Sequence, residues 1–252
     1  MRTGWAAAVW CAAGLAAAQE PAYMDAATHP AQGQSYVRVL GYAAEYDDPG
    51  PETRRQSMGL KLAHGLRSST ALVVESEWAR REGGGETDSG FVRAGLLLKQ
   101  RFLRRDLGPL DTWRASVLAG ADLPGDEMVR EAAHVSPRLG VATTAILGRH
   151  GLNGQIDWTG RTGEDDRFRL NGSYLYRLAP ATYAVDSRGA WYAVAEWLNE
   201  VTTGGDLRSD AVTGLLYEAR NWAAEVGLRL PLAQDGLPEL RQEVVVGLRW
   251  LP

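Results

Sequence analysis

The chain has 252 residues, a formal net charge of −4 and one cysteine. This charge balance leaves no strongly basic surface for a nucleic acid, and one cysteine cannot build a disulfide framework. After residue 19 no stretch is long and apolar enough for a membrane-spanning helix, which needs about 18 apolar residues. A membrane-spanning strand is only half apolar and is compatible with this composition.

The N-terminus is typical of a secretory signal peptide. Arg2 gives a short positive region, residues 5–15 are apolar, and three alanines precede Gln19. We therefore predict a signal peptide at residues 1–18, cleaved after about Ala18, which would export the chain. The cysteine at position 11 lies within the signal peptide, so the exported chain would contain none.

Residues 19–34 are polar and show no periodicity, which predicts an exposed N-terminal leader ahead of a barrel domain at 35–252. A second possibility is that residues 20–34 fold into the barrel lumen as a partial plug, because they have no partner of their own.

From residue 35 onward, segments of about ten residues with alternating polarity recur between turn signals, the pattern of a β-barrel. We predict an all-β transmembrane antiparallel up-and-down barrel of about twelve strands. The strands are expected near 35–46, 54–66, 69–81, 89–103, 111–122, 136–148, 151–161, 166–178, 187–199, 208–218, 221–231 and 240–251.

The alternation is clear in the last predicted strand. Val244, Val246 and Leu248 occupy even-numbered positions, while Glu243 and Arg249 occupy odd-numbered positions. A period of two places these sets on opposite faces of a strand. In a transmembrane barrel the apolar face contacts lipid and the charges line the lumen, because a charge at the bilayer midplane costs about 2–4 kcal/mol.

In each predicted strand, the alternating positions that carry the charges thus predict which residues line the lumen. These charges either create a field that selects solutes or pair across adjacent strands and plug the barrel, and a barrel of this size is compatible with both. The candidates are Glu75, Glu77, Arg93, Arg114, Asp157, Arg169, Arg177, Glu196, Glu218, Glu225, Arg229, Glu243 and Arg249.

Tryptophan side chains are expected at the two membrane interfaces, where their rings lie at headgroup depth. Packing in a protein core is the alternative. The candidates are Trp78, Trp113, Trp158, Trp222 and Trp250.

The predicted connections alternate in length. Those at 66–69, 148–151 and 218–221 are tight, whereas most of the others are longer, polar and rich in glycine and acidic residues, including 82–89 and 123–135. This asymmetry is typical of outer-membrane barrels with both termini in the periplasm. We also expect one short helix at 126–134, in an outer loop. A soluble sandwich of two sheets is the alternative fold.

Four segments of the C-terminal part resemble a family of outer-membrane transporters named for the meta pathway of phenol degradation. They are Ala195–Glu200 (AEWLNE), Thr213–Tyr217 (TGLLY), Glu225–Leu232 (EVGLRLPL) and Val244–Trp250 (VVVGLRW). The resemblance implies a barrel that passes small, often aromatic or otherwise apolar, compounds. Such barrels usually end on an aromatic residue, whereas here Leu251 and Pro252 follow Trp250.

Catalytic and metal-binding motifs are not evident. The four histidines at 29, 64, 134 and 150 are dispersed, so we expect no metal and no cofactor. A lipid-hydrolysing barrel would need a serine and a histidine on adjacent strands at the outer interface, and no such pair is apparent. We therefore do not expect an enzyme.

The expected function is passive passage of small molecules through an outer-membrane barrel. The main alternative is an envelope barrel that does not transport, acting as a scaffold or binding through its loops, with a plugged lumen. A barrel lipid hydrolase is a third reading. The expected partners are outer-membrane lipid, a small-molecule solute and the barrel-assembly machinery, which would act on the C-terminal strand; no nucleic acid is expected.

Overall fold

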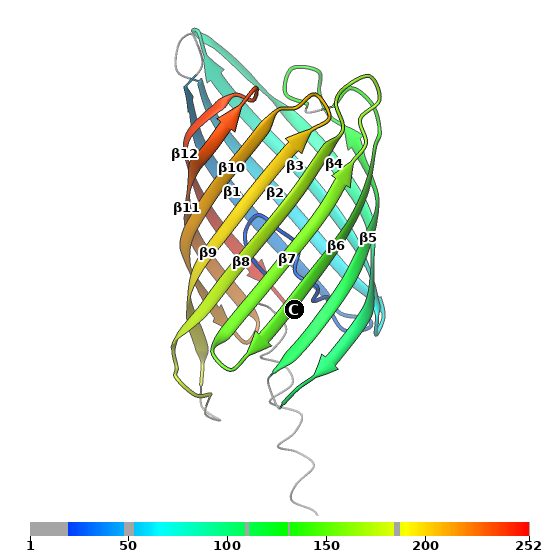
Figure 1. Ribbon diagram of the computed structural model, residues 1–252, viewed down its shortest axis with the longest axis vertical. Coiled ribbons are helices and arrows are strands. Elements are labelled where there is room, and N and C mark those ends of the chain that lie inside the picture. Colours follow the sequence, from blue (N-terminus) through cyan, green and yellow to red (C-terminus); the bar gives the residue numbers. More distant parts are fainter. Residues whose placement is uncertain (1–19, 48–52, 109–110, 131, 184–186, 252) are drawn as a thin grey trace, which may run out of the picture.

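The computed structural model describes residues 20–47, 53–108, 111–130, 132–183 and 187–251. They form a closed barrel of twelve antiparallel strands, as predicted (Figure 1). The ends of the strands differ from the predicted ends by at most four residues. The strands are β1 (Ser35–Asp47), β2 (Thr53–Arg67), β3 (Thr70–Gly83), β4 (Glu86–Asp106), β5 (Thr112–Pro124), β6 (Ser136–Leu147), β7 (His150–Thr159), β8 (Arg167–Ala179), β9 (Gly189–Thr202), β10 (Leu207–Ala219), β11 (Trp222–Asp235) and β12 (Glu239–Trp250).

Each strand pairs with its neighbours in sequence, and β1 pairs with β12 to close the barrel. Val37 lies opposite Trp250 and Asp47 opposite Glu239, so the closing pair extends over nearly the whole of both strands. Closure leaves no strand edge with unpaired backbone groups, which a structure surrounded by lipid requires. Within the described residues, no helix is long and apolar enough to cross a membrane.

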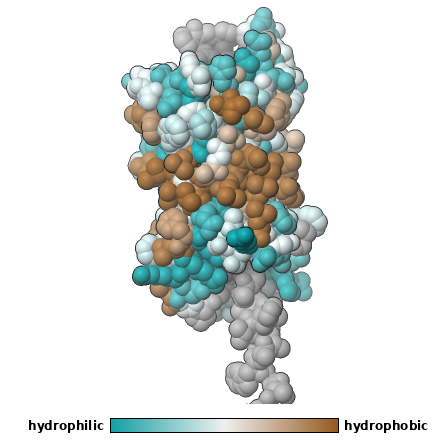
Figure 2. Space-filling view, turned by 90° about the vertical axis from the view of Figure 1, so that its right-hand side faces the viewer, coloured by the Kyte–Doolittle hydropathy of each residue, from teal (hydrophilic) through white to brown (hydrophobic). Residues whose placement is uncertain are grey.

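The outside of the barrel is apolar and the lumen is polar. On β12, Val244, Val246 and Leu248 are exposed on the outer surface, whereas Glu243 and Arg249 are buried. Figure 2 shows apolar side chains gathered in a band across the middle of the face in view, with mostly polar side chains above and below it. A soluble sandwich would bury the valines and expose the arginines, so that alternative is excluded.

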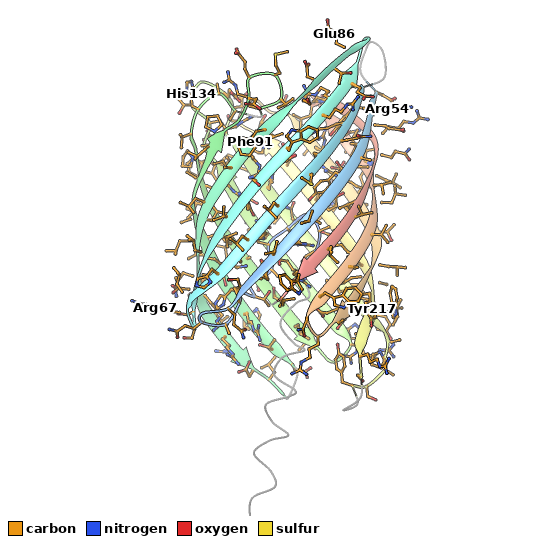
Figure 3. The ribbon with its side chains drawn as sticks, turned by 180° about the vertical axis from the view of Figure 1, so that it is seen from behind. Arg54, Arg67, Glu86, Phe91, His134 and Tyr217 are labelled. Atoms are coloured by element: carbon orange, nitrogen blue, oxygen red, sulfur yellow. The ribbon has the colours of Figure 1, made fainter. Side chains whose placement is uncertain are left out.

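The two ends of the barrel differ. At the terminal end β1 begins and β12 ends, and the turn that follows Arg67 lies there; Glu86 and His134 lie at the opposite end, here called the loop end (Figure 3). The tight connections predicted at 66–69, 148–151 and 218–221 are all at the terminal end. In outer-membrane barrels the short turns face the periplasm and the longer loops face the outside.

The connection predicted at 82–89 is much shorter than expected. Strands β3 and β4 continue as a hairpin, and only Gly84 and Gly85 separate them. Both glycines have positive φ values, 62° and 84°, which is the backbone conformation of a tight two-residue hairpin turn. The glycine run is therefore a turn and not a loop.

The helix predicted at 126–134 is not present among the described residues, which omit residue 131. Arg130 donates its backbone N–H to the carbonyl of Asp126 at 2.9 Å, which makes a single turn. The Asp126 carboxylate instead accepts the backbone N–H of Phe91 at 2.7 Å, and Val129 packs on Ala79 and Val92. These contacts hold the segment against β3 and β4, which prevents a free-standing helix.

The tryptophans predicted at the interfaces lie on the outer surface. Trp158 is half-buried and donates its indole N–H to Asp166 at 3.0 Å, whereas the other four are exposed: Trp78, Trp113, Trp222 and Trp250.

A cluster of aromatic side chains lies at the terminal end. Trp222 is opposite Trp250, its ring centroid is 5.2 Å from that of Tyr217, and Tyr217 is 4.8 Å from Trp191. Aromatic girdles of outer-membrane barrels have this composition and place. The anchoring role of these side chains stays a prediction.

Residues 20–30 lie inside the lumen, where they cross the barrel at about mid-height (the dark blue segment of Figure 1), and residues 31–34 are exposed where they lead into β1. The prediction of an exposed leader is wrong for residues 20–30, because Glu20, Met24 and Ala27 are buried, and it holds only for residues 31–34. The barrel wall supplies the polar partners that this segment lacks on its own. The predicted signal peptide at 1–18 lies outside the described residues.

Candidate functional site in the lumen

The lumen segment, residues 20–30, is held to the wall by hydrogen bonds from its own backbone. The N–H of Ala22 donates to Glu196 Oε1 at 2.9 Å, and the N–H of Asp25 donates to Gln155 Oε1 at 2.7 Å. Further along, the N–H of Ala27 donates to Thr144 Oγ1 at 2.8 Å. The partners are on β9, β7 and β6, so one side of the barrel wall receives the whole first half of the segment.

Charged contacts hold the segment from the other side. The Glu20 carboxylate accepts a hydrogen bond from Lys61 Nζ at 2.9 Å and lies 4.0 Å from Arg38 and 3.6 Å from Arg249. Lys61 also binds the carboxylate of Asp25. Because β1, β2 and β12 supply these three cations, the anchor spans the seam at which the barrel closes.

Glu20 is almost fully buried, and burial alone would raise the pKa of its carboxyl group. Lys61, Arg38, Lys99 and Arg249 have the opposite effect, and together they hold the pKa of Glu20 well below its ordinary range. A buried carboxylate is tolerated only when it is paired and hydrogen-bonded. Glu20 is therefore an ionised anchor.

The middle of the segment also uses its carbonyl groups. Lys99 Nζ donates to the carbonyl of Ala26, and Ser116 Oγ donates to the carbonyl of Ala27 at 3.0 Å. Lys99 and Ser116 are themselves buried. Donors from β4 and β5 thus complete a ring of contacts around the segment.

The loop end of the lumen contains a cavity of about 600 Å³, here called the vestibule. Its floor includes Ala22, Tyr23, Met24 and Asp25 of the lumen segment, and its walls come from strands on all sides of the barrel. A volume of this size is in the range of small-molecule binding sites.

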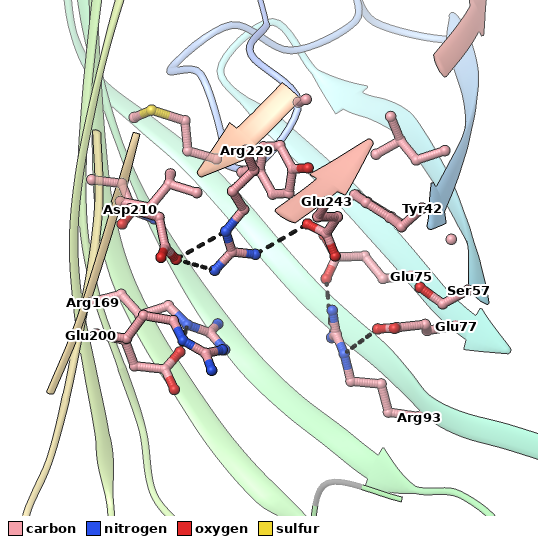
Figure 4. A pocket seen from close by; sticks show the side chains of 18 of the residues that line it. Tyr42, Ser57, Glu75, Glu77, Arg93, Arg169, Glu200, Asp210, Arg229 and Glu243 are labelled. Carbon is pink, nitrogen blue, oxygen red and sulfur yellow. Dashed lines mark hydrogen bonds and ion pairs between the residues drawn. The ribbon is translucent and has the colours of Figure 1, made fainter. Parts of the chain in front are cut away.

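Ion pairs cover much of the vestibule wall (Figure 4). Arg229 Nε donates to Asp210 Oδ2 at 2.9 Å, and its Nη1 donates to Glu243 at 3.2 Å. Arg169 Nε donates to Glu200 at 2.9 Å. Each pair joins neighbouring strands, so the charges line the wall and leave the centre of the cavity open.

A second network covers the opposite wall. Arg93 lies 3.5 Å from Glu75, 3.6 Å from Glu77 and 3.3 Å from Asp122. Arg138 donates to Glu75 at 2.7 Å. Strands β3 to β6 are cross-linked in this way.

Eleven of the thirteen predicted lumen residues take part in the lumen segment's contacts or in ion pairs within the lumen. Of these, Glu225 pairs with Arg38 at 2.6 Å and Glu218 with Arg249 at 3.2 Å. The two others lie toward the terminal end: Arg114 donates to Thr112, and Arg177 stacks on Tyr183 at 4.3 Å. Their part in solute selection stays a prediction.

Several residues of the vestibule were not among the predicted candidates. Asp210 has the same parity as Glu218 on β10, so the pattern could have indicated it. Arg138 is the single charged residue of β6, which has no alternation of charge. Glu200 was assigned to a loop, whereas β9 continues to Thr202.

The terminal end of the lumen is packed with apolar side chains. One cluster joins Leu175, Tyr192 and Leu216 with Tyr183 from the connection between β8 and β9. A second includes Tyr36, Val73, Leu97 and the neighbouring Ala63. The terminal end of the lumen thus combines these apolar clusters with a few buried charges, including the Arg249–Glu218 pair.

A serine and a histidine do meet on adjacent strands, as a lipid hydrolase would require. Ser35 Oγ and His64 Nδ1 are 2.9 Å apart on β1 and β2. The pair lies at the terminal end, however, and among the described residues no acidic side chain hydrogen-bonds to His64. It lacks the third group that would orient the base.

No group of three or more potential metal ligands occurs among the described residues. No protein-family model matches the chain, and no curated protein matches its sequence.

Solved structures match the chain by fold. An outer-membrane channel from Pseudomonas putida F1 has a TM-score of 0.62 at 14% identity, covering 93% of this chain and 100% of that one. LpxR from Salmonella typhimurium has a TM-score of 0.51 at 7% identity, covering 86% and 99%. The chain therefore has the fold of outer-membrane β-barrels. The likeness shows the fold alone, and the meta-pathway assignment stays a prediction.

Proposed function

We propose that this protein is a passive channel of the bacterial outer membrane for small molecules. The observation that carries the proposal is the polar vestibule of about 600 Å³ inside a barrel whose outer surface is an apolar band. Solutes would enter the vestibule from the loop end and pass the lumen segment by diffusion. The fold likeness to an outer-membrane channel supports this proposal.

The resemblance of the last strands to the meta-pathway transporters favours small, often aromatic solutes. The vestibule has surfaces for an apolar part of such a solute, because Tyr42, Tyr46, Leu237 and Pro238 lie among its lining residues. The lumen charges predicted from parity would then set the preference among solutes. Export by a signal peptide and insertion by the barrel-assembly machinery belong to the same proposal.

Reconstitution tests the proposal. We expect purified protein in planar bilayers to conduct ions in small steps, and proteoliposomes to swell in small solutes but not in large oligosaccharides. A variant that lacks residues 20–34 should conduct more, because the segment narrows the lumen. Absence of conductance in both proteins would contradict a channel. Equal conductance would show that the segment does not limit the path.

One observation favours a second candidate, an envelope barrel that does not transport. Two apolar clusters fill much of the terminal end, around Tyr192 and around Leu97, so the lumen is most obstructed below the vestibule. A barrel of this kind would bind its ligand at the loop end without passing it. Proteoliposomes would separate the two candidates, since the non-transporting barrel predicts no swelling even without residues 20–34.

A further inference from the structure

We propose that the vestibule selects and binds small organic oxyanions, that is, solutes carrying carboxylate or phosphate groups. This inference rests on the proposed channel function and names its solute class. It also specifies where recognition occurs, namely between the lumen segment and the mouth at the loop end.

The first argument is the charge of the lining. Among the described residues, eleven basic and seven acidic residues line the vestibule, and three further carboxylates, Glu20, Glu225 and Asp122, pair with lining cations. The basic residues still exceed these carboxylates by one, although the whole chain has a net charge of −4. Low-dielectric walls concentrate the field of such an excess inside a cavity. The vestibule therefore attracts anions although the protein as a whole is acidic.

The acidic residues of the vestibule are all engaged in ion pairs. Each of the seven carboxylates lies within 4.0 Å of a basic side chain. Some of these carboxylates contact two arginines, as Glu200 does with Arg167 and Arg169. Every carboxylate of the lining is therefore held by a cation, so none of them presents an unpaired negative charge to an incoming anion.

The third argument concerns the mouth of the vestibule. Arg81, Arg130 and Arg208 line it, and among the described residues none of them has a carboxylate within ion-pair distance. Arg208 donates to the carbonyl of Pro238, which fixes its position without neutralising it. A guanidinium has five N–H donors in a planar fork that matches carboxylate and phosphate oxygens.

Reversal potentials in a salt gradient test the selectivity. We expect wild-type protein to prefer chloride over potassium by at least about threefold, because the net positive field of the pore sets its preference. The double variant Arg81→Gln/Arg130→Gln should move the ratio toward unity. Neither substitution removes the partner of a carboxylate, so folding should be retained, and heat-modifiable migration on gels checks this.

The matched control is Arg80→Gln. Arg80 precedes Arg81 on β3, is half-exposed, pairs with Glu82 and does not line the vestibule. It should leave the permeability ratio unchanged. A ratio that falls equally in Arg80→Gln would reduce the effect to general surface charge and overturn the inference.

Binding is tested by block of the current. Citrate, inorganic phosphate and glucose are added separately to the chamber that faces the loop end. Block by citrate or phosphate, weakened in the double variant, supports the site, and the stronger of the two identifies the preferred oxyanion. Block by neither, or equal effects of glucose, overturns it.

Different results would disprove the channel function and the anion preference. No conductance from wild-type protein or from the variant without residues 20–34 defeats the channel itself. Conductance with no preference for anions, or with a preference for cations, leaves the channel standing and defeats the anion-selective vestibule.

Discussion

Lys61 reaches from β2 to the carboxylate of Glu20, where Nζ and Oε1 are 2.9 Å apart. The same ammonium group binds Asp25 and lies 3.9 Å from Glu75 of the wall. One side chain thus joins two acidic residues of the lumen segment to the barrel. The position of that segment in the lumen depends strongly on this contact.

We expect Lys61→Met to loosen the lumen segment and to raise the mean conductance. Removing one partner from a buried ion pair leaves the other charges uncompensated, at a cost on the order of 3 kcal/mol. Planar-bilayer recording measures the effect. Lys61→Arg is the control, because a guanidinium can still pair with Glu20 and Asp25. Identical conductance in wild type and Lys61→Met would show that this contact does not hold the segment.

The ionisation of Glu20 determines how conductance through the proposed channel should respond to acid. Because the pKa of Glu20 in the folded protein is lowered below its ordinary value of 4.5, its ionised form stabilises the docked segment fully above that value. The contribution is lost only as the pH falls through the lowered pKa. Between about pH 5 and pH 8, Glu20 should therefore cause no change in conductance.

Glu20→Gln is expected to conduct more than wild type across that whole pH range, because the neutral amide pairs poorly with Lys61, Arg38 and Arg249. Recording both proteins at several pH values provides the test. A wild-type channel that opens between pH 8 and pH 5, with loss of this response in Glu20→Gln, would contradict an ionised anchor.

Gly120 on β5 should tolerate no side chain. A Cβ at this position would lie 2.0 Å from the carbonyl oxygen of Leu96 on β4, so Gly120→Ala must push two paired strands apart. We expect a loss of stability of about 1–3 kcal/mol, seen as unfolding at lower urea concentration. Gly172→Ala is the matched control, since its Cβ would meet its nearest neighbour only at 4.0 Å. Equal midpoints in the two variants would contradict this.

Trp222→Ala is expected to destabilise the barrel in lipid vesicles more than in detergent. It removes the ring that contacts Tyr217 at 5.2 Å, and aromatic pairs contribute about 0.5–1.5 kcal/mol beyond the area they bury. Loss of an interfacial anchor adds to this only in a bilayer. Trp222→Phe should keep most of the ring contact. The same loss in vesicles and in detergent would argue against anchoring.

The strand order and the inward-facing charges were predictable because one physical rule acts on every strand. Lipid excludes charge, so the parity of Glu243 and Arg249 indicates the lumen without any knowledge of their neighbours. The tight turn at Gly84 and Gly85 was missed because a glycine run is equally typical of a loop. The choice between them depends on the register of β3 and β4, which a local pattern does not contain.

The lumen segment could not be placed from its own residues. Its partners Thr144, Gln155 and Glu196 are more than one hundred residues away in sequence, and each is unremarkable within its strand. Only the pairing of strands β6 to β9 brings these three side chains to one side of the lumen. The arginines of the vestibule come from many strands, so the pattern of any one strand does not indicate how many of them meet there.

The position of Glu20 between Arg38 on β1 and Arg249 on β12 has a consequence for assembly. Arg38 and Arg249 come from the first and the last strand, so they can bind Glu20 together only after β1 has paired with β12. The residues synthesised ahead of the first strand must therefore wait for the end of the chain before they find their place. Protection of the N-terminal segment from proteases would then mark the moment at which the cylinder is complete.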